Sequence, residues 1–112
     1  MSGLHIGWYE NGQKWEEGNY KNFKREGKWT DWFENGKKSK EGLYKNGLRD
    51  GIWTYWYEFN GQKSEEGTYK DGIRDGKWTF WYPNGQVKKV KEIIKMEKKM
   101  DYGLSGIIRV KK

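Results

Sequence analysis

Residues 44–61 read YKNGLRDGIWTYWYEFNG and residues 69–85 read YKDGIRDGKWTFWYPNG. The chain therefore contains two closely similar segments. Self-similarity at a fixed period indicates a repeat architecture. Four glycines mark the period, at intervals of 24, 24 and 25 residues: Gly3, Gly27, Gly51 and Gly76. Asn-Gly pairs at 11–12, 35–36, 60–61 and 84–85 keep the same rhythm. The extra residue is Phe59, where we expect a bulge or a wider turn.

Each unit holds two short runs rich in aromatic residues and threonine, separated by turn residues. Asn-Gly is the strongest short hairpin signal, because both loop residues tolerate positive φ. A two-residue loop at positions 35–36 predicts three cross-strand pairs: Phe33 with Lys38, Asp31 with Lys40, and Trp29 with Gly42. In this register a Trp ring shields the bare backbone of a glycine. At the other hairpin end, Asn-Gly or Asp-Gly followed by Asp-Gly predicts a longer turn into the next strand.

These patterns predict an all-β fold, an elongated antiparallel β-meander of stacked hairpin repeats. Residues 1–85 form the array, with a half-unit at 3–12 followed by three full units, and residues 86–112 form a basic capping tail. By repeat register the tail begins with a last strand, whereas the spacing of Val87, Val90 and Ile94 also fits a short helix. We favour the strand, because Asn84-Gly85 matches three earlier turns that each lead into one.

Composition limits the chemistry open to this chain. Its 112 residues include eight Trp, eight Tyr and four Phe, so a small core must consist mainly of flat rings. With no cysteine and only His5, neither a disulfide framework nor a metal centre is expected, and no cofactor is implied. No apolar run is long enough to span a membrane. The chain as given is therefore expected to be cytoplasmic, unless a leader was removed.

The net charge of +7 is unevenly divided along the chain. Residues 1–85 carry 14 Lys/Arg against 13 Asp/Glu, whereas residues 86–112 carry nine against three. A basic cluster confined to a tail is more often solvation, or a loosely used arm, than a specific reader of nucleic acid. Weak nucleic-acid contact is expected from its lysines, Lys88, Lys89, Lys91, Lys95, Lys98 and Lys99.

The segments GKWTDWFENG, GIWTYWYEFNG and GKWTFWYPNG, followed by E-G-x-Y, carry a pattern that resembles the variant MORN (membrane occupation and recognition nexus) repeats of bacterial proteins. The match covers residues 3–85. The resemblance implies stacked hairpins in a meander, and an antitoxin-like or scaffolding role. The tail departs from the pattern, because Val90-Lys91 replaces Glu-Gly and Ile93 replaces Tyr.

Side-chain alternation in strands separates the aromatic residues into two faces. Trp29, Trp53 and Trp78 recur opposite glycine and are interpreted as a structural ladder. The column beside them changes from unit to unit, which is where a partner could be recognised, although drift on a solvated surface predicts the same. The candidate partner-binding residues are this column and the tryptophans of the other face: Asp31, Tyr55, Phe80, Trp32, Trp56 and Trp81.

Recurring charged residues do not form a catalytic pattern. Glu17, Glu41 and Glu66 alternate with lysines, which indicates a solvated ladder rather than two carboxylates converging on one cleft. The recurring arginines at 25, 49 and 74 are explained by a local ion pair or by stacking on a ring. We therefore predict no catalytic residues and no enzymatic activity.

Two classes of function follow. The first is a protein-binding module that neutralises a toxin, a nuclease or another effector, as an antitoxin, immunity factor or inhibitor does. The second is single-stranded RNA or DNA binding by ring stacking and the basic tail. The charge division favours the first, because stacking platforms interleave rings and cations on one surface. A lipid-surface role for the tail, and pairing of the open sheet edges into a dimer, stay open alternatives.

Overall fold

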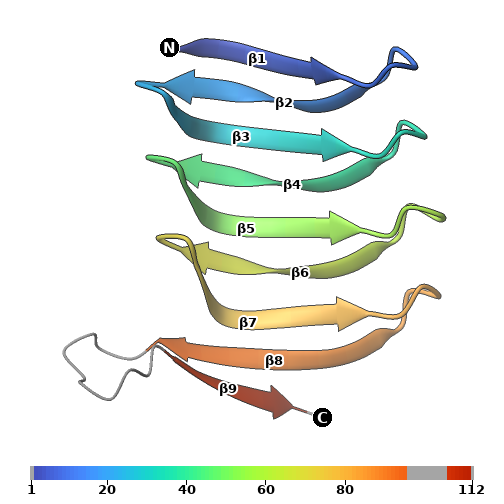
Figure 1. Cartoon of the computed structure of the whole chain (residues 1–112). Helices are drawn as coiled ribbons and strands as arrows, with labels where there is room; N and C mark the ends of the chain where they lie inside the picture. The colour runs from blue at the N-terminus through green and yellow to red at the C-terminus, as the bar shows by residue number, and fades with distance from the viewer. Residues whose placement is uncertain (1, 96–105, 112) are drawn as a thin grey trace.

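A computed structural model describes residues 2–95 and 106–111, which form a single antiparallel sheet with its strands in chain order (Figure 1). The strands are β1 (Gly3–Trp8), β2 (Lys14–Lys21), β3 (Lys24–Trp32), β4 (Lys38–Lys45), β5 (Leu48–Trp56), β6 (Lys63–Lys70), β7 (Ile73–Trp81), β8 (Val87–Lys95) and β9 (Gly106–Lys111). The described residues contain no helix. The all-β meander predicted from the repeat is confirmed.

The Asn-Gly turns, which lie at one side of the sheet in Figure 1, are longer than predicted. The Phe33 N–H donates to Lys37 O at 2.8 Å, and the Gly36 N–H donates to Phe33 O at 2.9 Å. Only the glycine takes positive φ, 87° at Gly36, as in a type I turn followed by a glycine bulge. Trp32 therefore faces Lys38 in place of Phe33, while the other two predicted pairs are confirmed.

The asparagine of each of the first three such turns links two units. Asn35 Oδ1 accepts the Lys37 N–H at 2.9 Å within its own turn, and Asn35 Nδ2 donates to Glu58 O of the next unit at 3.0 Å. Phe59 widens the following turn as expected, because the Tyr57 N–H now donates to Gln62 O at 2.8 Å. Asn60 nevertheless makes the same pair of bonds, to the Gln62 N–H at 2.9 Å and to Pro83 O at 2.7 Å.

The turns at the opposite side of the sheet are short. Lys45 pairs with Leu48, and the two residues between them, Asn46 and Gly47, have φ of 53° and 83°. This is a two-residue type I′ loop, so the prediction of a longer turn is wrong. The second glycine of the motif, Gly51 with φ of 73°, instead lies inside β5, where the register with β4 shifts and the strand bulges.

The bulges determine where the structural tryptophans pack. Although Trp29 pairs in register with Gly42, its ring lies on Gly18 of the preceding hairpin, where a Cβ atom would overlap it. Trp53 lies on Gly42 and Trp78 on Gly67 in the same way. The predicted ring-over-glycine contact is therefore present, but with the glycine of the other neighbouring strand. At the bulge, Gly18 faces three residues of β3. The ring of Trp29 fills the space that this glycine leaves.

The core is a row of rings on one side of the sheet. Trp29, Trp53 and Trp78 are 1%, 2% and 0% exposed. Each indole meets a tyrosine edge-to-face, with 5.2 Å between centroids in the Tyr20–Trp29, Tyr44–Trp53 and Tyr69–Trp78 pairs. The guanidinium carbons of Arg25, Arg49 and Arg74 lie 4.2, 4.8 and 4.3 Å from the same indole centroids, as the stacking interpretation predicted. We call this side, defined by Trp29, Trp53 and Trp78, the closed face.

The repeat register continues into the tail as a strand. In β8, Lys91 pairs with Trp78, and Ile93 pairs with Gly76 and packs against the aromatic core. The strand preferred over the helix is confirmed for Val87–Lys95. Lys98 and Lys99 lie outside the described residues.

Candidate functional site

One row of side chains crosses the closed face from β1 to β8. Consecutive members are paired in register on neighbouring strands. The row begins with glycine and acidic residues and ends with aromatic and basic ones. Its members are Gly7, Glu16, Asp31, Lys40, Tyr55, Glu65, Phe80 and Lys89. We call it the cross-sheet row.

The acidic end of the cross-sheet row is held by ion pairs. Glu16 is only 5% exposed, and its carboxylate lies 2.8 Å from His5 Nε2 and 3.4 Å from an Arg25 guanidinium nitrogen. Burial, and then the negative charge of Glu16, raise the pKa of Asp31 above its ordinary value, although Lys40 at 3.9 Å opposes the shift. Asp31 is thus a carboxylate whose charge is incompletely neutralised within the fold.

In the middle of the row, Tyr55 is partly exposed and also makes hydrogen bonds within the sheet. The Tyr55 hydroxyl accepts a hydrogen bond from Arg49 at 3.0 Å and lies 3.2 Å from the Tyr69 hydroxyl. Burial, with the hydrogen bond to Tyr69, raises the pKa of Tyr55. Its ring packs half-buried against the aromatic core. Tyr55 therefore presents one side of a fixed ring.

At the far end of the row, rings and cations meet. Lys89 Nζ and Lys91 Nζ lie 5.5 and 5.4 Å from the centroid of the Phe80 ring, and Lys88 Nζ lies 5.9 Å from that of Tyr82. The neighbouring charge of Lys91 lowers the pKa of Lys89. The expectation that the tail cations lie apart from the aromatic array therefore fails for these three lysines.

The other side of the sheet, which we call the open face, carries Trp32, Trp56 and Trp81. A lysine ammonium lies over each ring, with Lys14, Lys38 and Lys63 at 5.8, 5.9 and 5.8 Å from the centroids. The same ammonium groups pair with Glu17, Glu41 and Glu66 at 2.8, 3.1 and 3.3 Å. The glutamates thus form the ladder with lysines that their spacing predicted.

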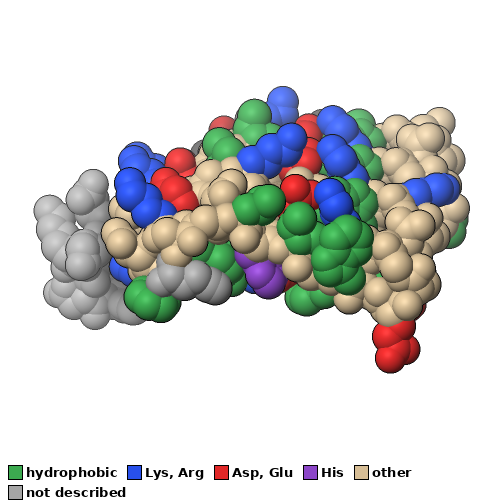
Figure 2. All heavy atoms as spheres, turned by 90° about the horizontal axis from the view of Figure 1, so that it is seen from above, with side chains coloured by type: hydrophobic (Ala, Val, Ile, Leu, Met, Phe, Trp, Pro, Cys, Tyr) green, Lys and Arg blue, Asp and Glu red, His purple; other side chains and the backbone are tan. Residues whose placement is uncertain are grey.

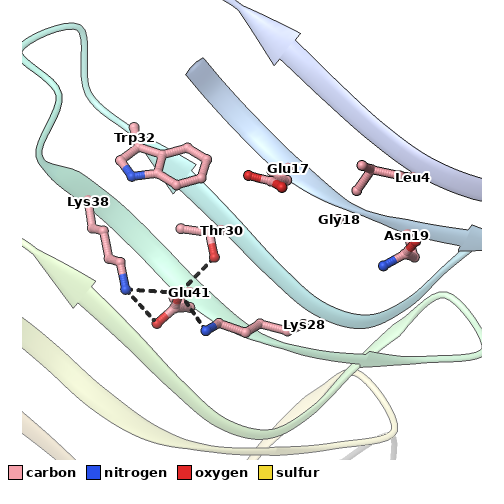
Figure 3. Close-up of a pocket in the computed structure, with 9 residues that line it drawn as sticks. All are labelled: Leu4, Glu17, Gly18, Asn19, Lys28, Thr30, Trp32, Lys38 and Glu41. Carbon is pink, nitrogen blue, oxygen red and sulfur yellow. Dashed lines mark hydrogen bonds and ion pairs between the residues drawn. The ribbon is translucent and has the colours of Figure 1, made fainter. Parts of the chain in front are cut away.

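Figure 3 shows one unit of this ladder. Thr30 Oγ1 donates to Glu41 at 2.6 Å, and both Lys38 and Lys28 approach the same carboxylate, at 3.1 and 3.5 Å. Burial raises the pKa of Glu41, but the hydrogen bonds from Thr30 and Lys38 outweigh that effect and lower it overall. A hollow of about 320 Å³ is lined by these residues and by Trp32. Acidic and basic side chains are also intermixed on the surface seen from above (Figure 2).

The six predicted partner-binding residues do not converge on one site. Asp31, Tyr55 and Phe80 are in the cross-sheet row on the closed face, whereas the three tryptophans occupy the open face. Of the basic residues, Lys88, Lys89, Lys91 and Lys95 belong to β8. The predicted binding residues did not include Glu16, Lys40 and Glu65 of the row. The signal that could have found them was the pairing across each Asn-Gly turn, which had already placed Lys40 opposite Asp31.

The described residues contain no group of three or more His, Cys, Asp or Glu side chains arranged to hold a metal ion. They also contain no helix long and apolar enough to cross a membrane.

Hairpins that share one register, one type of glycine contact and one asparagine link define a β-hairpin repeat protein. Four successive segments, residues 1–22, 25–46, 49–71 and 74–92, match the MORN repeat variant. The chain belongs to this family, whose repeats are generally modules for binding and interaction. The fourth match ends within β8. No curated protein and no solved structure matches the chain.

Proposed function

We propose that this protein is a non-enzymatic binding module that recognises another protein through the cross-sheet row of the closed face. The observation that carries the proposal is the change along this row, from Glu16 and Asp31 to Tyr55 and Phe80, on a scaffold whose adjacent tryptophan ladder stays constant. A scaffold that repeats needs the same residues in each unit. Residues that change beside it are free to match a partner.

The chemistry of the row suits a protein surface. Aromatic residues are enriched at interfaces because a ring buries a large area with few rotamers to immobilise. The half-buried rings of Tyr55 and Phe80 are already fixed against the core, so binding would immobilise little more. Asp31 adds a carboxylate beside them that is incompletely neutralised, whereas Glu16 and Glu65 are paired with Arg25 and Arg74 at 3.4 and 2.9 Å. A cationic group of a partner would complement the Asp31 carboxylate.

This complementarity supports an antitoxin-, immunity- or inhibitor-like role, in which the module occupies a basic effector such as a nuclease. Proteins that act on nucleic acid carry basic surfaces, because they neutralise phosphates. Asp31 and the rings of Tyr55 and Phe80 would then occupy the surface that the effector uses for its substrate.

The test is capture of a partner from the native host by the full chain, with and without nuclease treatment. Replacing both Tyr55 and Phe80 by Ser should weaken capture at least tenfold, while the far-ultraviolet circular dichroism stays that of a β-sheet. The matched control replaces Phe23 and Phe59, turn residues that are 79% and 68% exposed and lie outside the row, and should leave capture unchanged. Equal losses in the two double variants would contradict the proposal.

A second candidate function rests on Phe80 with Lys89 and Lys91, where a ring and two cations are interleaved as in binders of single-stranded nucleic acid. Replacing Lys88, Lys89, Lys91, Lys95, Lys98 and Lys99 by Gln should abolish weak, salt-sensitive RNA binding and leave protein capture intact. If tight RNA binding survives both this replacement and physiological salt, nucleic acid is the principal ligand through the rings of the array, and the protein-binding proposal is wrong.

A further inference from the structure

The open face carries a regular series of indoles, which we call the indole ladder: Trp8, Trp32, Trp56 and Trp81. Each hairpin contributes one ring, so successive rings are two strands apart. With strands about 4.8 Å apart, the rings recur about every 9.6 Å across the sheet. Figure 3 shows the fused rings of Trp32 turned with their broad side to the viewer, above the strands.

The indole N–H groups of this ladder have no acceptor among the described residues. In the closed face, by contrast, the N–H groups of Trp29, Trp53 and Trp78 donate to backbone carbonyls at 3.0, 2.9 and 3.0 Å. An indole N–H can only donate, so it needs an acceptor from water or from a ligand. The indole ladder therefore offers one unused donor in every unit.

Recesses lie between two of the three consecutive pairs of rings. One, of about 290 Å³, lies between Trp8 and Trp32, and another, of about 410 Å³, lies between Trp56 and Trp81. Their remaining linings are equivalent residues of the Asn-Gly turns and the first lysine of the next strand: Gly12, Gln13, Lys14 and Gly36, and Gly61, Gln62, Lys63 and Gly85. Each recess thus has an aromatic wall on two sides and polar groups beside them.

The charges of this surface disfavour an anionic ligand. Each ammonium that lies over a ring already pairs with a glutamate, Lys38 with Glu41 at 3.1 Å for example. The ammonium also occupies a position against the ring where a nucleic-acid base would stack. Because Lys14 and Lys63 line the recesses as well as lying over Trp32 and Trp81, what remains for a ligand is the rest of each recess and the indole N–H beside it. These features suit an uncharged, extended chain that is rich in acceptors.

A polyproline II helix has this chemistry and this period. It rises about 3.1 Å per residue with three residues per turn, which gives about 9.3 Å per turn, close to the spacing of the indole ladder. Its backbone has no internal hydrogen bonds, so its carbonyls are free to accept from the indoles. Proline rings dock in aromatic-lined grooves, and the stiffness of the helix reduces the entropy lost on binding.

We infer that the open face binds a proline-rich segment of a partner protein, in the polyproline II conformation and lying across the strands. One turn of the ligand corresponds to one hairpin, so that a proline at every third position enters successive recesses and the carbonyls between them accept from the indole N–H groups. The inference rests on the proposed function only in taking the partner to be a protein, because it uses the opposite face and none of the cross-sheet row.

The test titrates the full chain with two labelled synthetic peptides of identical composition. In one, proline occupies every third position over four turns, with Ala and Gln between. In the other, the prolines are separated alternately by two and by four positions. Fluorescence anisotropy should show saturable binding of the first peptide and at least tenfold weaker binding of the second. Equal affinity for the two would overturn the inference.

Two variants and a control locate the site. Trp56→Ala should weaken binding of the periodic peptide tenfold or more, as expected for a buried aromatic anchor. Trp56→Phe keeps an aromatic wall but lacks the N–H, and should give an intermediate loss. Trp15→Ala is the matched control, because Trp15 is 40% exposed and packs on Gly7 of the closed face, so the affinity should not change.

The remaining outcomes separate this inference from the proposed function. If the periodic peptide does not bind, or if a neutral β-linked oligosaccharide or single-stranded DNA displaces it and depends on Trp56, the inference is wrong. Capture of a partner through Tyr55 and Phe80 would be unaffected by either result. Conversely, binding of the peptide that persists in the Tyr55 and Phe80 double variant would support the inference even if that variant captured a partner normally.

Discussion

The closed and open faces carry tryptophan ladders of the same period, three residues apart in each unit, and the two ladders have opposite properties. On the closed face, Trp53 is 2% exposed, lies on Gly42 and donates its N–H to Leu43 O. On the open face, Trp56 is half-buried and has a lysine over its ring. The comparison shows that recurrence of an aromatic residue does not reveal its role. A structural tryptophan is distinguished by the glycine on which its ring packs and by the carbonyl that accepts its N–H. A tryptophan that lacks both is available to a ligand.

The largest loss of stability is expected from replacing Trp53 by Ala. Removing a fully buried indole leaves a cavity in a core that has few other residues, which should lower the free energy of unfolding by about 3–5 kcal/mol. Because stacked repeats stabilise their neighbours, a change in a central unit should unfold the array as a whole. Urea denaturation measures the effect, with Trp56→Ala as the matched variant. Similar losses for the two tryptophans would remove the distinction between the faces.

A smaller effect is expected from Gly42→Ala, which tests the glycine rather than the ring. A Cβ atom at Gly42 would overlap the buried ring of Trp53, which Tyr44 and Arg49 hold in place. Overpacking of this kind should destabilise by about 3 kcal/mol. The control is Gly27→Ala, where φ is 76° but nothing lies within 4 Å of the added atom, and strain alone should destabilise by about 1 kcal/mol. A Gly42 variant as stable as the Gly27 variant would show that the ring can move aside.

The smallest expected effect is a difference between the two faces in how their carboxylates change the stability of the fold in acid. The pKa of Glu41 on the open face is lowered by folding, so its contribution to stability is present above its unfolded pKa and is lost as the pH falls through the folded pKa. The pKa of Asp31 on the closed face is raised by folding, so its charge destabilises the fold at neutral pH, and this penalty disappears in acid.

Thermal unfolding as a function of pH measures the contributions of both carboxylates to stability. Glu41→Gln should lose stability at neutral pH and flatten the decline toward acid, whereas Asp31→Asn should gain stability at neutral pH and make that decline steeper. Shifts of the same sign in the two variants would contradict the assignment of opposite roles to these carboxylates.

The local sequence was sufficient to predict the repeat period, the division of side chains between two faces of the sheet, and the cross-strand pairs of Asp31 with Lys40 and Trp29 with Gly42. It was insufficient where two turn geometries share one motif, because Asn-Gly fits both a two-residue loop and a type I turn with a glycine bulge. It also could not place the ring of Trp29 on Gly18. That contact depends on a bulge between hairpins.

The asparagine links between units have a consequence for how such an array can change. Asn60 forms its bond to Pro83 O even though Phe59 lengthens the turn before it, so the irregularity is absorbed within one unit and the next hairpin starts in standard register. Positional error therefore does not accumulate along the molecule. Units could be gained or lost by duplication and deletion without disturbing the surfaces of the others, and the number of contacts to an extended ligand, hence its avidity, would change in whole steps.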